Sequence, residues 1–293
     1  MAVYVSTNVA TLQSQRYLSA GTQAVSRSSE RLTSGLRINA AGDDPANLQI
    51  SNRLTAQIGG LKRGNQNTTD GEALMQLTEQ ALDESVGLLQ RVRKLAIQSA
   101  NGTNTEKDRE ALQEEVTQIS RELTRIACKT TYGGAQVLAG AGKGLISEEG
   151  LLSVQVGADA YNTIEVKLDT SFAVSSMVAA VGGLGDGYKA AEGVFSLSSQ
   201  ANAQALLAGI DRYIQFVDDA RSEMGAVMNR FESHIRNQSN IHEEESDARS
   251  RMRDADFAAE TARLTSSSIV QDASSQMLLQ ANARPQLVIS LLR

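Results

Sequence analysis

The chain has 293 residues and a net charge of −6, and its acidic and basic residues are interspersed, which argues against the basic surface that nucleic acid or an anionic membrane requires. Hydrophobic residues make up 41% of the chain and aromatic residues only 4%, a balance that favours long helices over aromatic-walled ligand pockets. The single cysteine excludes an intramolecular disulfide. The sequence shows no cleavable signal peptide and no membrane span of about 20 apolar residues, so we expect any export to use a route that reads an uncleaved chain.

The first forty residues predict a helix with narrow apolar stripes. Val5 and Leu12 are seven residues apart, and Leu18, Val25 and Leu32 repeat at the same spacing. Gly42, two aspartates and Pro45 then stop this helix and offer an N-cap and a first-turn proline to the next one.

The next helix begins near Leu48 and is expected to loosen around the glycines at 59–60 and 64. It then strengthens into two adjacent rows of apolar residues and ends near Asn101-Gly102. The rows, which indicate burial against more than one neighbour, are Leu74, Ala81, Leu88 and Leu95 beside Met75, Leu82, Leu89 and Ala96.

A third helix restarts at Asn104 or Thr105 and stops at Tyr132-Gly133-Gly134. The period then changes to two in residues 152–156 and 164–168, which predicts a β-hairpin. Residues 171–200 are rich in Gly, Ser and Ala and indicate irregular connection with at most one short strand or helix.

A clean helical pattern returns from about Ala201, with Arg221 as its one interruption, and predicts packing against the helices at 74–100 and 106–130. A polar stretch at 243–247 separates it from a last helix that begins near Ala255. We expect Pro285 to end that helix, although apolar residues continue to the final positions.

These patterns predict a mainly α fold, with long helices in a coiled-coil-like bundle formed by both chain ends and a small β-hairpin in the middle. One pair of terminal helices cannot cover all of its apolar faces, so the stripes indicate a surface for association between copies. The residues predicted for subunit assembly are Val5, Leu12, Leu18, Val25, Leu32, Leu264, Ile269, Met277, Leu278, Leu291 and Leu292.

The sequence gives little support for a catalytic site or a metal-binding site. Cys128 has no histidine near it in the sequence, and His234 and His242 lie eight residues apart without the HExxH spacing of a zinc site. We therefore predict a non-enzyme with no catalytic residues, no metal and no cofactor.

Several long motifs closely resemble those of the bacterial flagellins. They lie at 30–39 together with Asp43-Asp44, at 89–101, at 251–262 and at 280–286. The resemblance covers roughly residues 1–140 and 205–293. Several independent motifs in the right order are more specific than any short pattern.

The resemblance implies a division into inner and outer parts of a filament. Residues 1–43 and 254–293 would form the two halves of an inner-tube helical domain, with a linking spoke near 34–46. Residues 44–140 and 201–253 would supply the helices of the outer-tube domain, and 141–200 its hairpin and loops. The short middle implies a flagellin with little or no variable surface domain.

The resemblance also implies a function, a location and partners. Such a subunit is secreted unfolded by the flagellar type III route with a flagellin chaperone, polymerises into the extracellular filament used for swimming, and meets cap and junction proteins. The terminal stripes would stay largely disordered in the monomer, because an unpaired helix buries too little surface to offset about 1–2 kcal/mol of backbone entropy per residue.

A second implied partner is the flagellin-sensing Toll-like receptor of animals. Arg91, Leu95 and Glu115 match the motif positions that this receptor binds, whereas Lys94 stands where an acidic residue is common. The simpler interpretation is that Arg91 and Glu115 are solvent-facing or subunit-interface charges.

Two other structural functions compete with the flagellin interpretation. A hook–filament junction protein of the flagellum shares the terminal-helix organisation, and a secreted coiled-coil translocator or adhesin would share the helical stripes. The flagellin-type C-terminus and the motif around Arg91 favour flagellin.

Overall fold

The computed structural model describes residues 7–182 and 184–291, with side chains up to Arg284. The chain divides into two compact units. We call Met1–Ile58 with Glu243–Arg293 the terminal unit, and Gly59–His242 the central unit. Two long helices, α2 (Pro45–Ala100) and α5 (Gln200–Arg253), have residues in both units.

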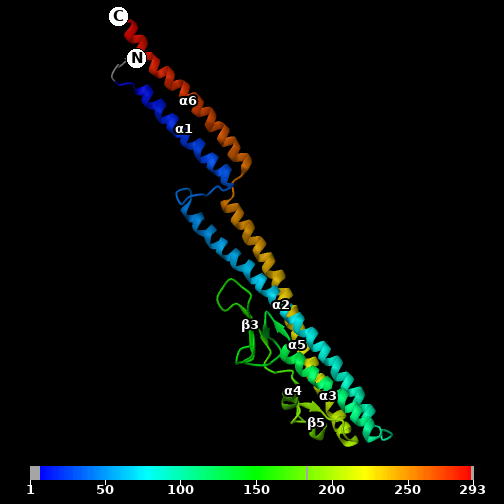
Figure 1. Cartoon of the computed structure of the whole chain (residues 1–293). Coiled ribbons are helices and arrows are strands. Elements are labelled where there is room, and N and C mark those ends of the chain that lie inside the picture. The colour runs from blue at the N-terminus through cyan, green and yellow to red at the C-terminus, as the bar shows by residue number, and fades with distance from the viewer. Residues whose placement is uncertain (1–6, 183, 292–293) are drawn as a thin grey trace. The chain divides into compact units, whose positions relative to one another are not determined.

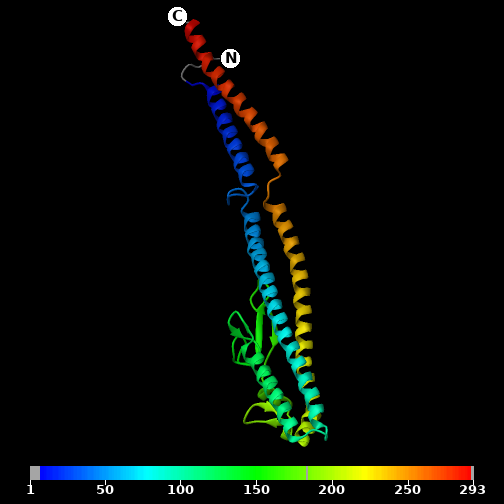
Figure 2. The ribbon, with the colours of Figure 1, turned by 45° about the vertical axis from the view of Figure 1, so that its right-hand side comes forward.

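The terminal unit is built on an antiparallel pair of helices, α1 (Val9–Ser34) and α6 (Phe257–Leu291), which lie side by side in Figures 1 and 2. The Asn8 side chain caps α1 by accepting a hydrogen bond from the backbone N–H of Thr11 at 3.2 Å. Gly35 ends the helix in a left-handed conformation (φ 70°) that favours glycine.

The second helix begins where the sequence predicted. The Asp44 carboxylate accepts a hydrogen bond from the backbone N–H of Asn47 at 3.0 Å, and Pro45 is the first helical residue. The loosening predicted around residues 59–65 is wrong, because α2 is continuous to Ala100. Glycine weakens a helix by only about 1 kcal/mol, which packing can offset.

The central unit has its core between α2, α5 and α3 (Glu106–Lys129); α3 is green in Figure 2 and runs beside the other two helices. The two predicted rows of α2 are confirmed, because Met75, Leu82, Leu89 and Ala96 are fully buried and their neighbours pack against the same cluster. On α5 the buried residues recur every seven positions, at Ile210, Val217, Met224 and Phe231.

Arg221, which interrupts the apolar pattern of α5, binds carboxylates on α2. Its guanidinium lies 2.7 Å from Glu79 and 2.9 Å from Asp83, at the edge of the core. Polar residues in a core-facing stripe are thus satisfied across the helix pair rather than left unpaired.

Small β elements complete the central unit. The predicted hairpin is confirmed as β3 (Leu151–Gln155) and β4 (Thr163–Lys167), with Leu152 opposite Val166 and Val154 opposite Ile164. Residues 171–200 contain more structure than predicted: α4 (Val174–Val181), a 3-10 turn η1 (Gly185–Gly187), and the strands β5 (Tyr188–Lys189) and β6 (Val194–Phe195). A further short pair, β1 (Thr131–Tyr132) and β2 (Ala135–Gln136), follows α3.

Two helix boundaries differ from expectation. The polar stretch 243–247 is helical, since α5 runs without a break to Arg253 and pairs Asp247 with Arg251 one turn later. Pro285 does not end the last helix, because α6 continues to Leu291. The φ angle of proline is compatible with a helix, although a proline inside one removes a backbone donor and crowds the carbonyl one turn earlier, at a cost of about 3 kcal/mol.

Candidate assembly surface and interhelix linker

The contact between α1 and α6 is a seam of alternating large and small residues. The small ones let the backbones approach closely: a Cβ added at Gly21 would lie 3.4 Å from the Cα of Gln271. The half-buried predicted residues are Leu18, Val25 and Leu32 on α1 and Leu264 and Leu278 on α6. The fully buried residues of the seam are Gly21, Ser28, Glu260, Ser274 and Ala281.

Hydrogen bonds fix the register of this seam along its length. The Asn8 amide donates to the Ala281 carbonyl at 2.8 Å, and the Gln271 amide donates to the Thr22 hydroxyl at 3.1 Å. At the other end the Ser28 hydroxyl donates to the Glu260 carboxylate at 2.7 Å. Polar contacts of this kind specify one pairing more than they add stability.

The remaining predicted assembly residues that are described with side chains are largely exposed. Leu12, Ile269 and Met277 are 52%, 63% and 60% exposed. Further large apolar side chains that are exposed on α1 and α6, and that the sequence patterns did not assign to assembly, are Val9, Tyr17, Phe257, Val270 and Leu279. Val5 and Leu292 lie outside the described residues, and Leu291 is described as helical without its side chain.

A groove also lies between the two helices. It encloses about 380 Å³, with Tyr17 on the α1 side and Val270 and Met277 on the α6 side. Large exposed apolar surfaces with such grooves are typical of association sites. We call the exposed apolar residues and this groove the assembly face.

Two short non-helical segments of the terminal unit, 35–44 and 254–256, are bound to each other. The backbone N–H of Arg37 donates to the Arg253 carbonyl at 2.7 Å, and that of Ala255 donates to the Gly35 carbonyl at 2.9 Å. Between these bonds Leu36 and Asp254 form an antiparallel bridge, and Ile38 is buried beside it. The two segments therefore form one hydrogen-bonded unit rather than two independent loops, and we call them the linker.

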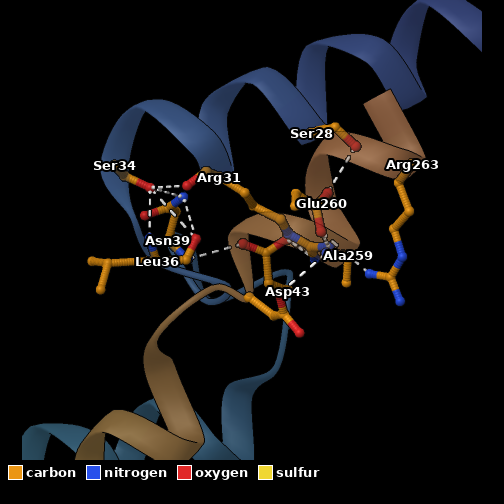
Figure 3. A network of polar contacts seen from close by, with 10 residues as sticks. Ser28, Arg31, Ser34, Leu36, Asn39, Asp43, Ala259, Glu260 and Arg263 are labelled. Carbon is orange, nitrogen blue, oxygen red and sulfur yellow. Dashed lines mark hydrogen bonds and ion pairs between the residues drawn. The ribbon is translucent and has the colours of Figure 1, made fainter. Parts of the chain in front are cut away.

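Charged side chains reinforce the linker, as Figure 3 shows. Arg31 lies 3.9 Å from both Asp43 and Glu260, so it joins the loop to the start of α6. Asp43 also accepts backbone N–H bonds from Ala40 and Asn39 at 3.1 Å, and these donors hold the pKa of its carboxyl below the ordinary value. Neither Arg31 nor Glu260 was singled out from the sequence.

The comparison with known proteins places this arrangement in a family. Residues 5–143 match the bacterial flagellin N-terminal helical region, and residues 207–292 match the bacterial flagellin C-terminal helical region. A flagellin of Halalkalibacterium halodurans is 38% identical, with 98% of each chain covered, and Flagellin D of Vibrio anguillarum is 36% identical, with 100% of each covered. The chain belongs to the bacterial flagellin family.

As a flagellin, the chain is a structural subunit of the flagellar filament, which is an extracellular self-assembled polymer. The fold is also similar to that of a putative flagellar hook-associated protein from Vibrio parahaemolyticus, with a TM-score of 0.57 at 16% identity over 72% of this chain and 100% of that one. Since the junction proteins considered above share the terminal-helix plan, the family match, and not the fold, favours the filament subunit.

The flagellin motif around Arg91 carries two exposed ion pairs on the central unit. The guanidinium of Arg91 on α2 lies 2.7 Å from Glu115 on α3, and these side chains are 56% and 41% exposed. Two residues later, Arg93 lies 2.8 Å from Asp211 on α5. Leu95 is almost fully buried in the core, so it positions α2 and offers no free surface.

The residues considered for chemistry were Cys128, His234 and His242. Within residues 7–182 and 184–291, no group of three His, Cys, Asp or Glu side chains is placed to hold a metal ion. His234 is half-buried, and burial lowers its pKa below 6.5. Cys128 is half-buried and unpaired by any disulfide. In the same described residues, no helix has both the length and the apolar character to cross a membrane.

Proposed function

We propose that this chain polymerises through its terminal unit, with a division of labour among the predicted apolar residues. Leu18, Val25, Leu32, Leu264 and Leu278 hold α1 against α6, whereas Leu12, Ile269 and Met277 pack against neighbouring copies. The observation that carries the proposal is that the first group is half-buried within one chain, whereas the second group is left exposed. Val5, Leu291 and Leu292 extend the same apolar character at the chain ends.

The energetics favour self-association of this face. Burying one large apolar side chain contributes about 1.5–3 kcal/mol, so a few such contacts per neighbour suffice for a stable polymer when they repeat along it. The assembly face includes five large apolar side chains in exposed positions: Leu12, Tyr17, Ile269, Val270 and Met277.

The test is the critical concentration for polymerisation of purified chain, measured by sedimentation and negative-stain microscopy. We expect Ile269→Ser and Met277→Ser each to raise it about tenfold or more, because each removes one apolar contact between subunits. Gln276→Ser, at an exposed polar position between them, is the matched control and should leave it unchanged. Wild-type assembly by both apolar variants would contradict the proposal.

Export and folding follow from the same features. We propose that the chain leaves the cell unfolded by the type III route with a chaperone. The terminal helices then become ordered as they join the filament used for swimming. In the filament these helices form the inner tube, and the spoke at 34–46 leads to the outer-tube domain. The seam supports coupled folding, because few large side chains are buried in it. Amides of residues 9–34 and 257–284 should exchange rapidly in monomer and slowly in filament; protection in both states would contradict this.

A second candidate function is recognition by the flagellin-sensing Toll-like receptor. The exposed Arg91 and Glu115 support it, since an ion pair on an open helix surface can exchange its partner for one on a receptor. We expect Arg91→Ala to weaken activation of receptor-bearing reporter cells by monomer, with Arg125→Ala on the exposed end of α3 as a control. Equal activation by the two variants would remove this function.

A further inference from the structure

The tip of the β3–β4 hairpin presents an unusual residue. Tyr161 is 96% exposed, and its backbone is left-handed with a φ of 65°, the only such non-glycine residue in the part of the chain that the structure describes. A left-handed conformation is energetically unfavourable for a residue with a side chain. Because the side chain of Tyr161 is almost fully exposed, its packing within its own chain does little to offset this cost, and strained residues concentrate at functional sites.

The hairpin that carries Tyr161 is seated directly on the backbone of α2. A Cβ added at Gly64 would lie 2.1 Å from the Val156 carbonyl oxygen, and one added at Gly60 would lie 2.5 Å from the Cβ of Ala158. From α5, the buried amide of Gln238 donates to the same Val156 oxygen at 2.7 Å. The hairpin is thus fixed to two helices just before its tip.

The tip itself is also internally bonded. The Gln155 side chain donates to the carbonyls of Gly157 and Asp159 at 3.0 and 2.7 Å, and the backbone N–H of Val156 donates to the Asn162 carbonyl at 2.9 Å. A side chain presented from a fixed backbone loses little entropy when a partner binds it. The tip therefore has the properties of a preorganised contact.

A matching recess lies beyond the other end of β4. It encloses about 170 Å³, and its floor includes Phe172 and Phe216, whose ring centroids are 5.8 Å apart. A cavity of about 150 Å³ holds one benzene ring. Asp219 and Glu223 line the recess as well, and their carboxylates can accept the hydrogen bond of a phenol.

We propose that Tyr161 of one copy inserts its ring into the Phe172–Phe216 recess of a neighbouring copy and donates its hydroxyl to the carboxylates there. The two partners are different patches of one chain, so the contact is heterologous and propagates along a helical polymer instead of closing a dimer. The proposal rests on the polymerisation described above and adds a contact made by the central unit.

Photo-crosslinking tests the contact directly in filaments whose morphology matches that of wild type. With p-benzoylphenylalanine in place of Tyr161, illumination should join two chains, and mass spectrometry should locate the second site in residues 167–172 or 216–224. The same probe at Glu165, on the exposed face of β4, is the control. Cross-linking to any other segment, or none in intact filaments, overturns the proposal.

Substitutions separate this contact from a merely structural role. Tyr161→Gly removes the ring and relieves the left-handed strain, so we expect an unchanged or higher unfolding temperature of monomer together with an about tenfold higher critical concentration. Tyr161→Phe should fall between glycine and wild type. If wild-type chains form filaments and Tyr161→Gly assembles equally well, the Tyr161 contact is wrong while polymerisation stands; if wild-type chains form none, polymerisation itself is wrong.

Discussion

The two units of this flagellin treat their apolar residues differently. The central unit encloses a continuous cluster that includes Leu82, Leu89, Tyr213 and Phe231, all with no exposed surface. The terminal unit buries glycine, serine and alanine in its seam and leaves Ile269 and Met277 more than half exposed. The central unit is therefore complete within one chain, whereas we infer that the terminal unit depends on other copies.

Removal of both chain ends should produce the largest effect. A chain of residues 45–253 keeps the central core and lacks the α1–α6 pair. We expect it to remain helical and to melt cooperatively by circular dichroism, and to form no filaments at any concentration tested. Ordinary filaments from this trimmed chain would show that the terminal unit is not the assembly element.

Two substitutions to alanine, one in each unit, compare the units within the full-length chain. Phe231→Ala should lower the free energy of unfolding of monomer by about 3–5 kcal/mol in urea titrations, because it empties a fully buried site. Leu12→Ala, at an exposed site, should change that free energy by less than about 0.5 kcal/mol while raising the critical concentration. A large loss of monomer stability from Leu12→Ala would contradict the distinction.

Spacing in the sequence was enough to predict the buried rows of α2 and the hairpin of the central unit. The seven-residue rows of α2 and the period-two strands correspond directly to buried faces, because burial on one side requires that spacing. The same spacing placed Leu18 and Leu12 together as assembly residues, although one is half-buried in the seam and the other is exposed. Spacing identifies an apolar face and not which partner covers it.

Other features had no local signal in the sequence. The repeat of Ser14, Gly21 and Ser28 marks a close helix contact only once α6 is known to lie opposite. Likewise the link from Arg31 to Glu260 joins residues far apart in the chain. The glycines at 60 and 64 were interpreted as helix-weakening, whereas they make room for a hairpin whose position depends on tertiary packing.

Two glycines near the start of the central unit should respond in opposite directions. Gly64→Ala places a methyl group against the Val156 carbonyl and should destabilise the monomer by about 1–3 kcal/mol. Gly59→Ala, five residues earlier on the same helix, meets no atom within 4 Å and should stabilise it by about 0.5–1 kcal/mol. Thermal unfolding of both variants measures the difference, and equal shifts would contradict the seating of the hairpin on α2.

Acid should affect the two units in different pH ranges, with smaller effects than the substitutions above. Burial lowers the pKa of His234 below 6.5, so the unfolded chain takes up this proton at a higher pH than the folded chain does. Stability of the central unit should therefore fall as pH drops below about 6.5, and His234→Gln should remove that part of the dependence.

In the linker, protonation of a carboxylate makes stability depend on pH in a lower range. Hydrogen bonds from Ala40 and Asn39 lower the pKa of Asp43 below 3.8, so its stabilising contribution is present above that value and is lost as pH falls through the folded pKa. The protection of the amides of residues 36–43 against hydrogen exchange in filaments should fall only below about pH 4. Asp43→Asn should show this lower protection already at neutral pH. If instead exchange in the linker rises near pH 6, the histidine of the central unit and the linker are coupled, and the two regions are not as independent as their separate cores indicate.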